Sequence, residues 1–503
     1  MARLFVLCDG TWNSDGRPTH TNVVKFRDAL APHDATSVPQ KYEYFAGVGT
    51  SGTPWEQLAG GAFGSGLERN VQEAYEWIAR TYRTDDSIHL IGFSRGAFTA
   101  RSVGGMIARC GLIDLSPEAG VPPDQGWDEV RDCFAMYRRK PRTEGSEPLP
   151  GRKRAVAIHF IGVWDTVGAR GIPNEFGTIG MLDDEKYGFH DTELSKAVEH
   201  ARHALALDER RQTFSPTLWS RQWPGQTVKQ VWVPGVHGDV GGGYPETELS
   251  DGPLAWMIEE ARGLGIGFRE DACTRLTHRP DGQLHDSVTG IFRRLRQRPR
   301  AAPRIREADD VHPSVLERSA AFMNGQATYW ANRELTEGGS VECAIPANDP
   351  WHFTGLYLEK NVTYRFAAEG EWSDDGIRCD PAGRVIAGPL HQRFIRNLGG
   401  LGDVVERATG TSLNLVFSRR ENEHPWFCLI GAVANGARED GEHETFRIGV
   451  GTDFTPSASG YLFCFANDDW FMYENNSGRV GLSVRIASPA QPLPEPALAA
   501  QDQ

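Results

Sequence analysis

The chain has 503 residues, of which 39% are hydrophobic and 24% charged, and its formal net charge at pH 7 is −14. Because single domains rarely grow beyond about 250 to 300 residues, this length predicts two domains. The negative charge argues against a general nucleic-acid-binding protein, which needs a basic face to displace counterions from phosphates.

Other global features predict a soluble protein. There is no run of 18 apolar residues, so we expect no transmembrane segment, and the N-terminus has no signal-peptide core. The eight cysteines are scattered without CxxC pairs. We therefore expect reduced thiols in a cytosolic compartment.

The first third of the chain alternates short β-branched or aromatic runs with amphipathic helical stretches, a pattern typical of a doubly wound α/β domain with a mostly parallel sheet. Strands are predicted at residues 2–8, 42–46, 87–92, 155–164 and 228–234, and helices at 67–82, 97–110, 193–207 and 254–264. The long connections at 114–153 and 167–227 could form a lid. We assign residues 1–335 to this domain.

Beyond about residue 335 the composition becomes rich in glycine, asparagine and aromatic residues, with short alternating strands such as 362–367 and 460–465. A second, all-β domain is predicted over residues 340–487. Residues 488–503 are mostly proline, alanine and glutamine, which predicts a disordered tail.

A nucleophile-elbow motif, Gly92-Phe93-Ser94-Arg95-Gly96, joins the strand at 87–92 to the helix that follows. The glycines remove Cβ atoms where the strand folds back into the helix, so that the Ser94 hydroxyl is pushed outward. The motif predicts Ser94 as the nucleophile of a serine hydrolase. An ordinary strand–helix turn is the alternative.

A serine hydroxyl needs a general base and an orienting carboxylate, which in this fold follow in the chain order Ser, Asp, His. Asp165 directly follows the strand at 155–164, and His237 follows the strand at 228–234 in a glycine-dense loop. We predict Asp165 and His237 as these partners. Asp239 is the alternative carboxylate, a helix N-cap is the alternative role of Asp165, and a loop histidine bonded to backbone is the alternative for His237.

Two segments are expected to supply the oxyanion hole. The backbone N–H of Arg95 lies at the positive end of the helix that begins after the nucleophile. Gly10 and Thr11, in the loop after the first strand, would supply further N–H groups, although a purely structural turn is an equal alternative there.

Seven arginines between residues 293 and 306 form one dense basic stretch. This stretch could hold an anionic headgroup or face a membrane, but a solvated loop is the preferred interpretation.

Several segments together resemble a family of α/β hydrolases that includes the Tle-class phospholipase effectors of type VI secretion. The matching segments are residues 7–13, 21–24, 44–50, 92–97, 163–168, 204–209 and 237–243. The resemblance implies the catalytic triad Ser94, Asp165 and His237 and suggests lipid ester substrates. It also implies that a protein without a signal peptide could be exported by a contact-dependent secretion system instead of remaining cytoplasmic.

The C-terminal region resembles the calcium-dependent galactose-binding lectins of PA-I type, which are small β-sandwiches. Residues 351–356, 368–376, 467–468 and 473–478 carry this resemblance, and the bulky run at 469–472 departs from it. Asp468, Asn475 and Asn476 could offer the oxygen ligands that calcium prefers.

The leading hypothesis is therefore hydrolysis of carboxylic esters, lipid or phospholipid esters first, with no cofactor for catalysis. A calcium-dependent carbohydrate-binding protein with a scaffold hydrolase domain, a glycan-targeted esterase and an acyltransferase are the alternatives. Metal-dependent hydrolysis is disfavoured because the sequence has no HExxH motif.

Overall fold

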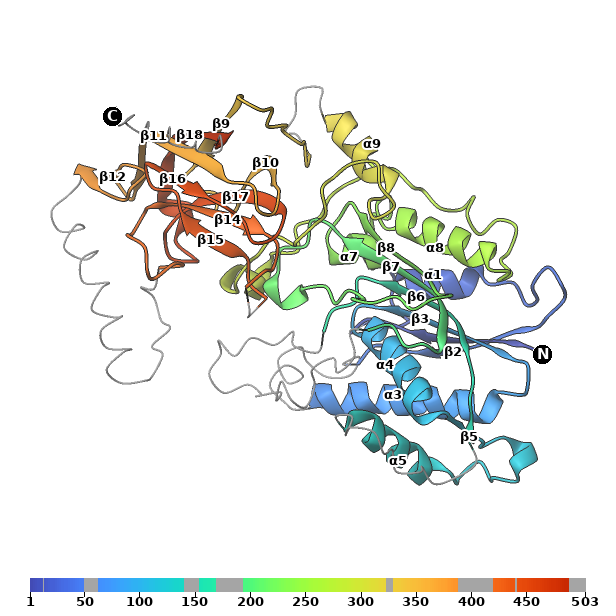
Figure 1. The fold of residues 1–503 in the computed structure, drawn as a ribbon. Coiled ribbons are helices and arrows are strands. Elements are labelled where there is room, and N and C mark those ends of the chain that lie inside the picture. The colour runs from blue at the N-terminus through green and yellow to red at the C-terminus, as the bar shows by residue number, and fades with distance from the viewer. Residues whose placement is uncertain are drawn as a thin grey trace, which may run out of the picture. The chain divides into compact units, whose positions relative to one another are not determined.

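The computed structural model describes residues 1–11, 13–48, 62–139, 153–168, 193–322, 329–387, 419–438 and 441–487. The contacts divide the chain into two compact units, Met1–Tyr329 and Trp330–Gln503 (Figure 1). Parts of the predicted lid segments, at 140–152 and 169–192, and the predicted tail at 488–503 lie outside the described residues.

The first unit is built on a six-stranded parallel sheet with the strand order β2-β1-β3-β6-β7-β8. Its strands are β1 (Arg3–Cys8), β2 (Gln40–Phe45), β3 (Ser87–Phe93), β6 (Ile158–Trp164), β7 (Val198–Ala206) and β8 (Thr227–Val233). The inner strands are almost fully buried, as expected where both faces of a parallel sheet are covered. All five strands predicted for this unit are present.

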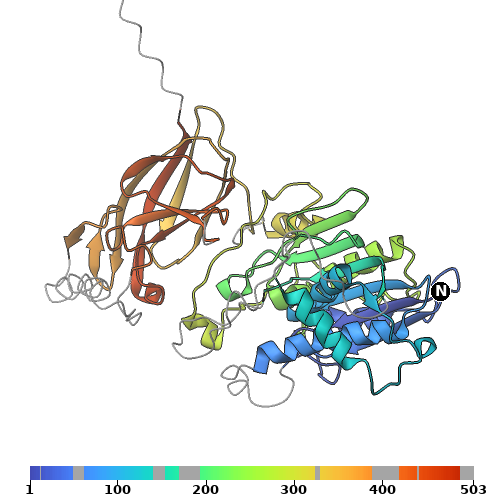
Figure 2. The ribbon, with the colours of Figure 1, turned by 60° about the horizontal axis from the view of Figure 1, so that its bottom comes forward.

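Helices cover both faces of this sheet (Figures 1 and 2). One face packs against α3 (Ala62–Thr81), α4 (Arg95–Cys110) and α5 (Trp127–Arg138), and the other against α1 (Asn22–Ala29) and α8 (Asp251–Gly263). Shorter elements of the unit are β4 (Leu112–Ile113), β5 (Lys153–Arg154), α7 (His237–Gly241) and α9 (Pro313–Phe322). The unit therefore has the mixed α/β architecture with two helical layers that the sequence predicts.

The helix predicted over residues 193–207 is wrong. This segment forms β7, an inner strand that pairs in parallel with both β6 and β8. Alanine and leucine at its end are strong helix formers, but intrinsic propensity amounts to less than about 1 kcal/mol per residue. Pairing with two neighbouring strands outweighs it because it satisfies the buried backbone on both sides. The correction matters for the site, because Ala204 and Ala206 of β7 bond to Asp165.

A buried histidine of β7 should make the stability of the fold depend on pH. His203 is fully buried, and its Nε2 accepts the backbone N–H of Thr166 at 3.0 Å. Burial, together with the charge of Arg101, lowers the pKa of His203 to about 3. The unfolded chain, with a histidine pKa of about 6.5, therefore binds a proton between these two values that the folded chain does not, so stability falls as pH drops below about 6.5.

We expect this histidine to reduce the free energy of unfolding by about 2 kcal/mol between pH 7 and pH 5. Urea unfolding at the two pH values measures the change. The His203→Gln variant keeps an acceptor for Thr166 but does not titrate, so its loss between the two pH values should be smaller by about that amount. An equal loss in the variant and the wild type would contradict this assignment.

The second unit consists of antiparallel sheets that enclose one apolar core. The first sheet has the order β10-β17-β14-β15, with β10 at His352–Leu358, β14 at Leu429–Ala434, β15 at Glu444–Arg447 and β17 at Gly460–Ala466. The second has the order β13-β12-β11-β18-β9, with β16 (Gly451–Phe454) paired to β11. Its members are β9 (Ser340–Pro346), β11 (Tyr364–Asp374), β12 (Ile377–Cys379), β13 (Val385–Ala387) and β18 (Asn476–Ile486). The predicted strands at 362–367 and 460–465 correspond to β11 and β17.

The eight cysteines all carry free thiols, and seven of them are buried. Among the helices that the structure describes, none combines the length and the apolar character needed to cross a membrane.

Candidate active site

Ser94 occupies a strained turn between β3 and α4. Its backbone angles are φ 58° and ψ −123°, a combination that L-residues rarely adopt. A Cβ atom on Gly92 would lie 2.6 Å from the Cα of Ala97, and one on Gly96 would collide with the backbone oxygen of Cys8. The two glycines of the motif are therefore required by close backbone approach, as the sequence interpretation proposes.

His237 lies against the elbow. It is the first residue of α7, a short helix inside the stretch that was predicted to be a loop. Its ring packs on Phe93, with centroids 4.7 Å apart, and edge-on to Phe214 at 4.9 Å. A side chain on Gly241, at the end of the same helix, would overlap the Phe93 ring. The close packing of α7 on Phe93 thus brings His237 next to the serine-bearing turn.

Asp165 follows the end of β6 and is completely buried, with a positive φ of 40°. Its Oδ2 lies 2.5 Å from Nδ1 of His237, and its Oδ1 accepts the backbone N–H of Ala206 at 2.9 Å. A carboxylate at Nδ1 keeps the proton on that nitrogen, so the lone pair of the neutral ring is on Nε2. Asp239, the alternative carboxylate, bonds instead to His285, whose Nδ1 is 2.5 Å from its Oδ1.

Arg300 binds the same carboxylate and was not predicted as a site residue. Its Nη1 donates to Oδ1 of Asp165 at 2.5 Å and its Nη2 to Oδ2 at 2.9 Å. The same two nitrogens donate to the carbonyls of Ala206 and Phe214, both at 2.7 Å. Arg300 is only 5% exposed. The interpretation of the arginine-rich stretch as a solvated loop is therefore wrong at this residue, although Arg293, Arg296 and Arg306 are exposed.

These neighbours set the protonation of the pair. Burial opposes ionisation of Asp165, but the charge of Arg300 and the hydrogen bond from His237 outweigh it and hold the pKa of that carboxyl well below its usual range. Burial lowers the pKa of His237, and the hydrogen bond and charge of Asp165 only partly offset this. At neutral pH the pair is therefore a carboxylate and a neutral imidazole, which is the state a general base requires.

A second buried carboxylate, Glu209, holds the backbone of His237. Its Oε2 accepts the N–H of His237 at 3.2 Å, and its Oε1 accepts the hydroxyl of Ser287 at 2.9 Å. Arg211 neutralises it through Nε and Nη2, at 2.9 and 2.7 Å, and the guanidinium of Arg211 lies 3.5 Å from the centre of the Phe214 ring. Sequence reasoning noted Glu209 only as part of a matching segment and gave it no role.

The loop predicted to contribute to an oxyanion hole lies beside Ser94. A Cβ on Gly10 would be 3.2 Å from the Cβ of Ser94. The N–H of Gly10 donates to Oδ1 of Asp9 at 2.7 Å, while Oδ2 of Asp9 accepts from Thr21 and Tyr44 at 2.8 and 2.7 Å. Asp9 therefore orders this loop and engages the Gly10 N–H. The N–H groups of Thr11 and Arg95 remain predicted donors.

The predicted calcium ligands of the second unit are brought together only in part. Nδ2 of Asn476 donates to Oδ2 of Asp468 at 2.8 Å, whereas Nδ2 of Asn475 donates to Asp374 at 2.9 Å. The buried Oδ1 of Asn476 has no hydrogen-bond partner within the described part of the chain. Asp468 and Asn476 could thus offer oxygens to one cation, with Asn475 directed elsewhere, and calcium binding stays a prediction.

The first unit combines a parallel α/β sheet with a strained, serine-bearing turn at the end of β3. Residues 2–260 match the family model of the catalytic domain of type VI secretion (T6SS) Tle1-like phospholipase effectors. Because this match spans more than half of the 503 residues, the chain belongs to the Tle1-like phospholipase effector family. The family assignment made from the sequence segments is confirmed.

One curated relative matches part of the chain. The uncharacterized protein YEL023C of Saccharomyces cerevisiae is 30% identical over 228 residues, which cover 42% of this chain and 32% of that protein. The chain thus spans about a third of the length of this curated relative.

Solved structures are similar only at low TM-scores. An uncharacterized protein from Pseudomonas aeruginosa has a TM-score of 0.30 and 18% identity, with 54% of this chain and 47% of that chain covered. The Tle1 effector bound to the VgrG spike has a TM-score of 0.30 and 17% identity, with coverage of 49% and 51%. The N-terminal domain of EclA, a PllA-like lectin, has a TM-score of 0.19 and 16% identity, with coverage of 30% and 100%. The lectin likeness of the second unit therefore stays a prediction.

Proposed function

We propose that this chain is a serine esterase that hydrolyses lipid esters, and phospholipids in particular, through Ser94, His237 and Asp165. The observation that carries the proposal is the 2.5 Å contact between Nδ1 of His237 and Asp165. The His237 ring also packs on Phe93, the residue that precedes Ser94 in the chain. The lipid class follows from the family, whose described activity is that of a phospholipase effector.

The first half of the reaction forms an acyl-enzyme. Nε2 of His237 takes the proton of the Ser94 hydroxyl while Oγ attacks the ester carbonyl, and Asp165 stabilises the imidazolium that results. The oxyanion is stabilised by the N–H of Arg95 at the start of α4. His237 then returns the proton to the alcohol oxygen as the ester C–O bond breaks. In the second half, His237 takes a proton from water as the water attacks the acyl-enzyme, and returns that proton to Oγ of Ser94 as the fatty acid leaves.

Export is the second element of the proposal. Membership in a family of type VI effectors supports delivery by a contact-dependent secretion system, in agreement with the expectation drawn from the sequence.

The test is labelling of the full chain with a fluorophosphonate probe, followed by a panel of simple esters and phospholipids. The wild type should be labelled and should release fatty acid, and Ser94→Ala should do neither while keeping its circular dichroism spectrum. Ser102→Ala is the matched control, because Ser102 is a buried serine of α4, the helix that begins directly after Ser94. Labelling that persists in Ser94→Ala, or a folded wild type that takes up no probe and cleaves no ester, would overturn the proposal.

A further inference from the structure

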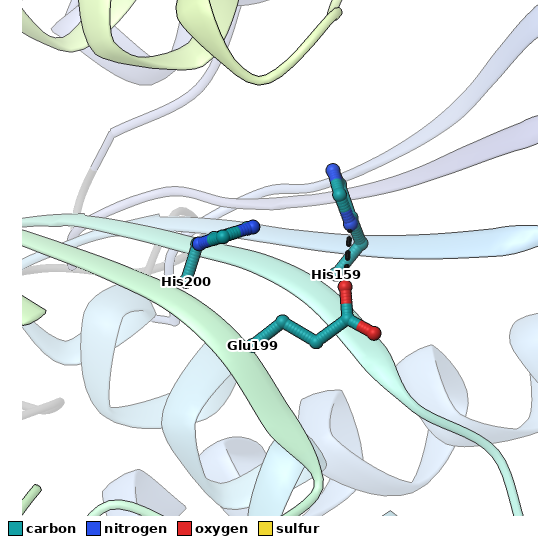
Figure 3. Close-up of side chains that lie close together, drawn as sticks. All are labelled: His159, Glu199 and His200. Carbon is teal, nitrogen blue, oxygen red and sulfur yellow. Dashed lines mark hydrogen bonds and ion pairs between the residues drawn. The ribbon is translucent and has the colours of Figure 1, made fainter. Parts of the chain in front are cut away.

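Two histidines and a glutamate lie close together at the amino ends of two inner strands of the parallel sheet, whereas Ser94 follows the carboxyl end of a strand. His159 is near the amino end of β6, and Glu199 and His200 are near the amino end of β7. One ligand atom from each lies within 4.8 Å of the others, and Figure 3 shows the His200 ring directed toward His159. Ser94 follows the carboxyl end of β3, so this cluster is separate from the candidate active site.

A β-bulge places His159 in the cluster. Residues Ile88 and His89 of β3 pair with Ile158 and Phe160 of β6, so His159 is an extra residue opposite β3. Its ring lies 5.2 Å from that of His200 and 5.3 Å from that of the buried His89, both edge-on. Bulges often redirect a side chain near functional positions, and here the bulge brings an imidazole to the side of the sheet where His200 lies.

Each histidine has its second ring nitrogen bound to an oxygen. Nε2 of His159 contacts the carbonyl of Leu264 at 3.3 Å, and Nδ1 of His200 contacts Oγ1 of Thr227 at 2.8 Å. Donation of an N–H to a carbonyl or hydroxyl oxygen is the usual outer-shell arrangement of a metal-binding histidine, because it fixes the tautomer and orients the ring. When those nitrogens carry the ring protons, the lone pairs of the neutral rings are on Nδ1 of His159 and Nε2 of His200.

The carboxylate of Glu199 completes the group. Its Oε2 is 2.7 Å from Nδ1 of His159, a hydrogen-bond distance that widens to about 3.3 Å when both atoms bind one tetrahedral ion. Arg202, on the same strand as Glu199, and Lys229 of β8 donate to Glu260, at 2.6 and 2.7 Å. The side chains of His159 and Glu199 are 24% and 48% exposed, so an ion can reach them from solvent.

We propose that His159, Glu199 and His200 bind a divalent first-row transition metal of the zinc class, with water in the remaining position. Two imidazoles and one carboxylate match the donors that zinc prefers, whereas calcium and magnesium favour all-oxygen sites. Bound there, the ion displaces the direct contact between His159 and Glu199. It links β6 and β7 and, through Leu264, the end of α8, which makes it a stabilising site with no part in the ester chemistry.

The test uses the full chain after removal of metals with a chelator and titration with Co²⁺ and Zn²⁺. We expect one tight equivalent, a visible Co²⁺ spectrum without the near-ultraviolet thiolate band that binding to cysteine would give, and a rise in Tm with Zn²⁺. His200→Ala and Glu199→Gln should each weaken binding at least tenfold and remove the rise in Tm. Both substitutions are at partly exposed positions, so that if one variant fails to fold the other still tests the site.

His352→Ala is the matched control, because His352 lies outside the cluster and contacts the carboxylate of Asp349 at 3.2 Å. It should bind the metal like the wild type, and probe labelling at Ser94 should be equal in all variants. A wild type that binds no metal, a thiolate band, or unchanged affinity in both His200→Ala and Glu199→Gln would overturn the proposal. Because the readouts are binding and Tm, these results stand apart from any result on esterase activity.

Discussion

Replacement of Asp165 by Asn is expected to lower kcat about 10⁴-fold, because the amide cannot hold His237 in the required tautomer or stabilise its imidazolium. In the wild type, Oδ2 of Asp165 receives the Nδ1 proton at 2.5 Å. An amide nitrogen in that place would instead donate to Nδ1 and move the ring proton to Nε2, where the Ser94 proton has to be accepted.

The same variant should be less stable than the wild type. Arg300 is buried against both oxygens of Asp165, and an amide leaves its charge without a counterion. Removing one partner of a buried ion pair costs about 3–5 kcal/mol. Activity must therefore be measured at a temperature at which circular dichroism shows the variant to be folded.

Asp239→Asn is the control for this prediction. Asp239 is also a buried aspartate bonded to a histidine, but its partner is His285 and not His237. Its kcat toward the best ester of the panel should stay within about tenfold of the wild type. If Asp239→Asn lost the greater part of the activity and Asp165→Asn did not, the assignment of the orienting carboxylate would have to be reversed.

The sequence predicts those parts of the site that depend on local spacing. Ser94 with its glycines lies within five residues, and the strained turn needs only the strand before it and the helix after it. Asp165 and His237 were found because each directly follows an apolar strand, and strand ends of a parallel sheet meet at one edge. In the structure, Asp165 and His237 contact each other.

What the sequence could not predict depends on partners that are far apart along the chain. Arg300 meets Asp165 across 135 residues, and nothing in the arginine-rich stretch distinguishes it from its exposed neighbours. The strand β7 was mistaken for a helix because its end is rich in alanine and leucine, and only pairing with β6 and β8 decides its conformation. Asn475 likewise bonds to a partner that is distant in the sequence, because its Nδ2 donates to Asp374, 101 residues away.

Replacement of Arg300 by Met tests whether this arginine positions the Asp165–His237 pair. Met fills a similar volume but leaves Asp165 with the N–H of Ala206 and the ring of His237 as its remaining partners. Loss of the two-pronged contact should allow the carboxylate to rotate, and a misplacement of this kind costs about 10²-fold in turnover. Arg300→Lys restores the charge without the planar fork, so it should recover part of the activity but not all of it.

The pH dependence separates this role from simple structural support. The charge of Arg300 offsets that of Asp165, so its removal strengthens the effect of the carboxylate on His237 and raises the pKa of the imidazole. In the wild type that pKa is held below the ordinary value of about 6.5, and activity is lost only as pH falls through it. In Arg300→Met the acid limb of the kcat/KM profile should therefore move to higher pH, and in Arg300→Lys it should stay close to that of the wild type. A variant with a lower Tm but an unchanged acid limb would show that Arg300 supports the fold and has no influence on the base.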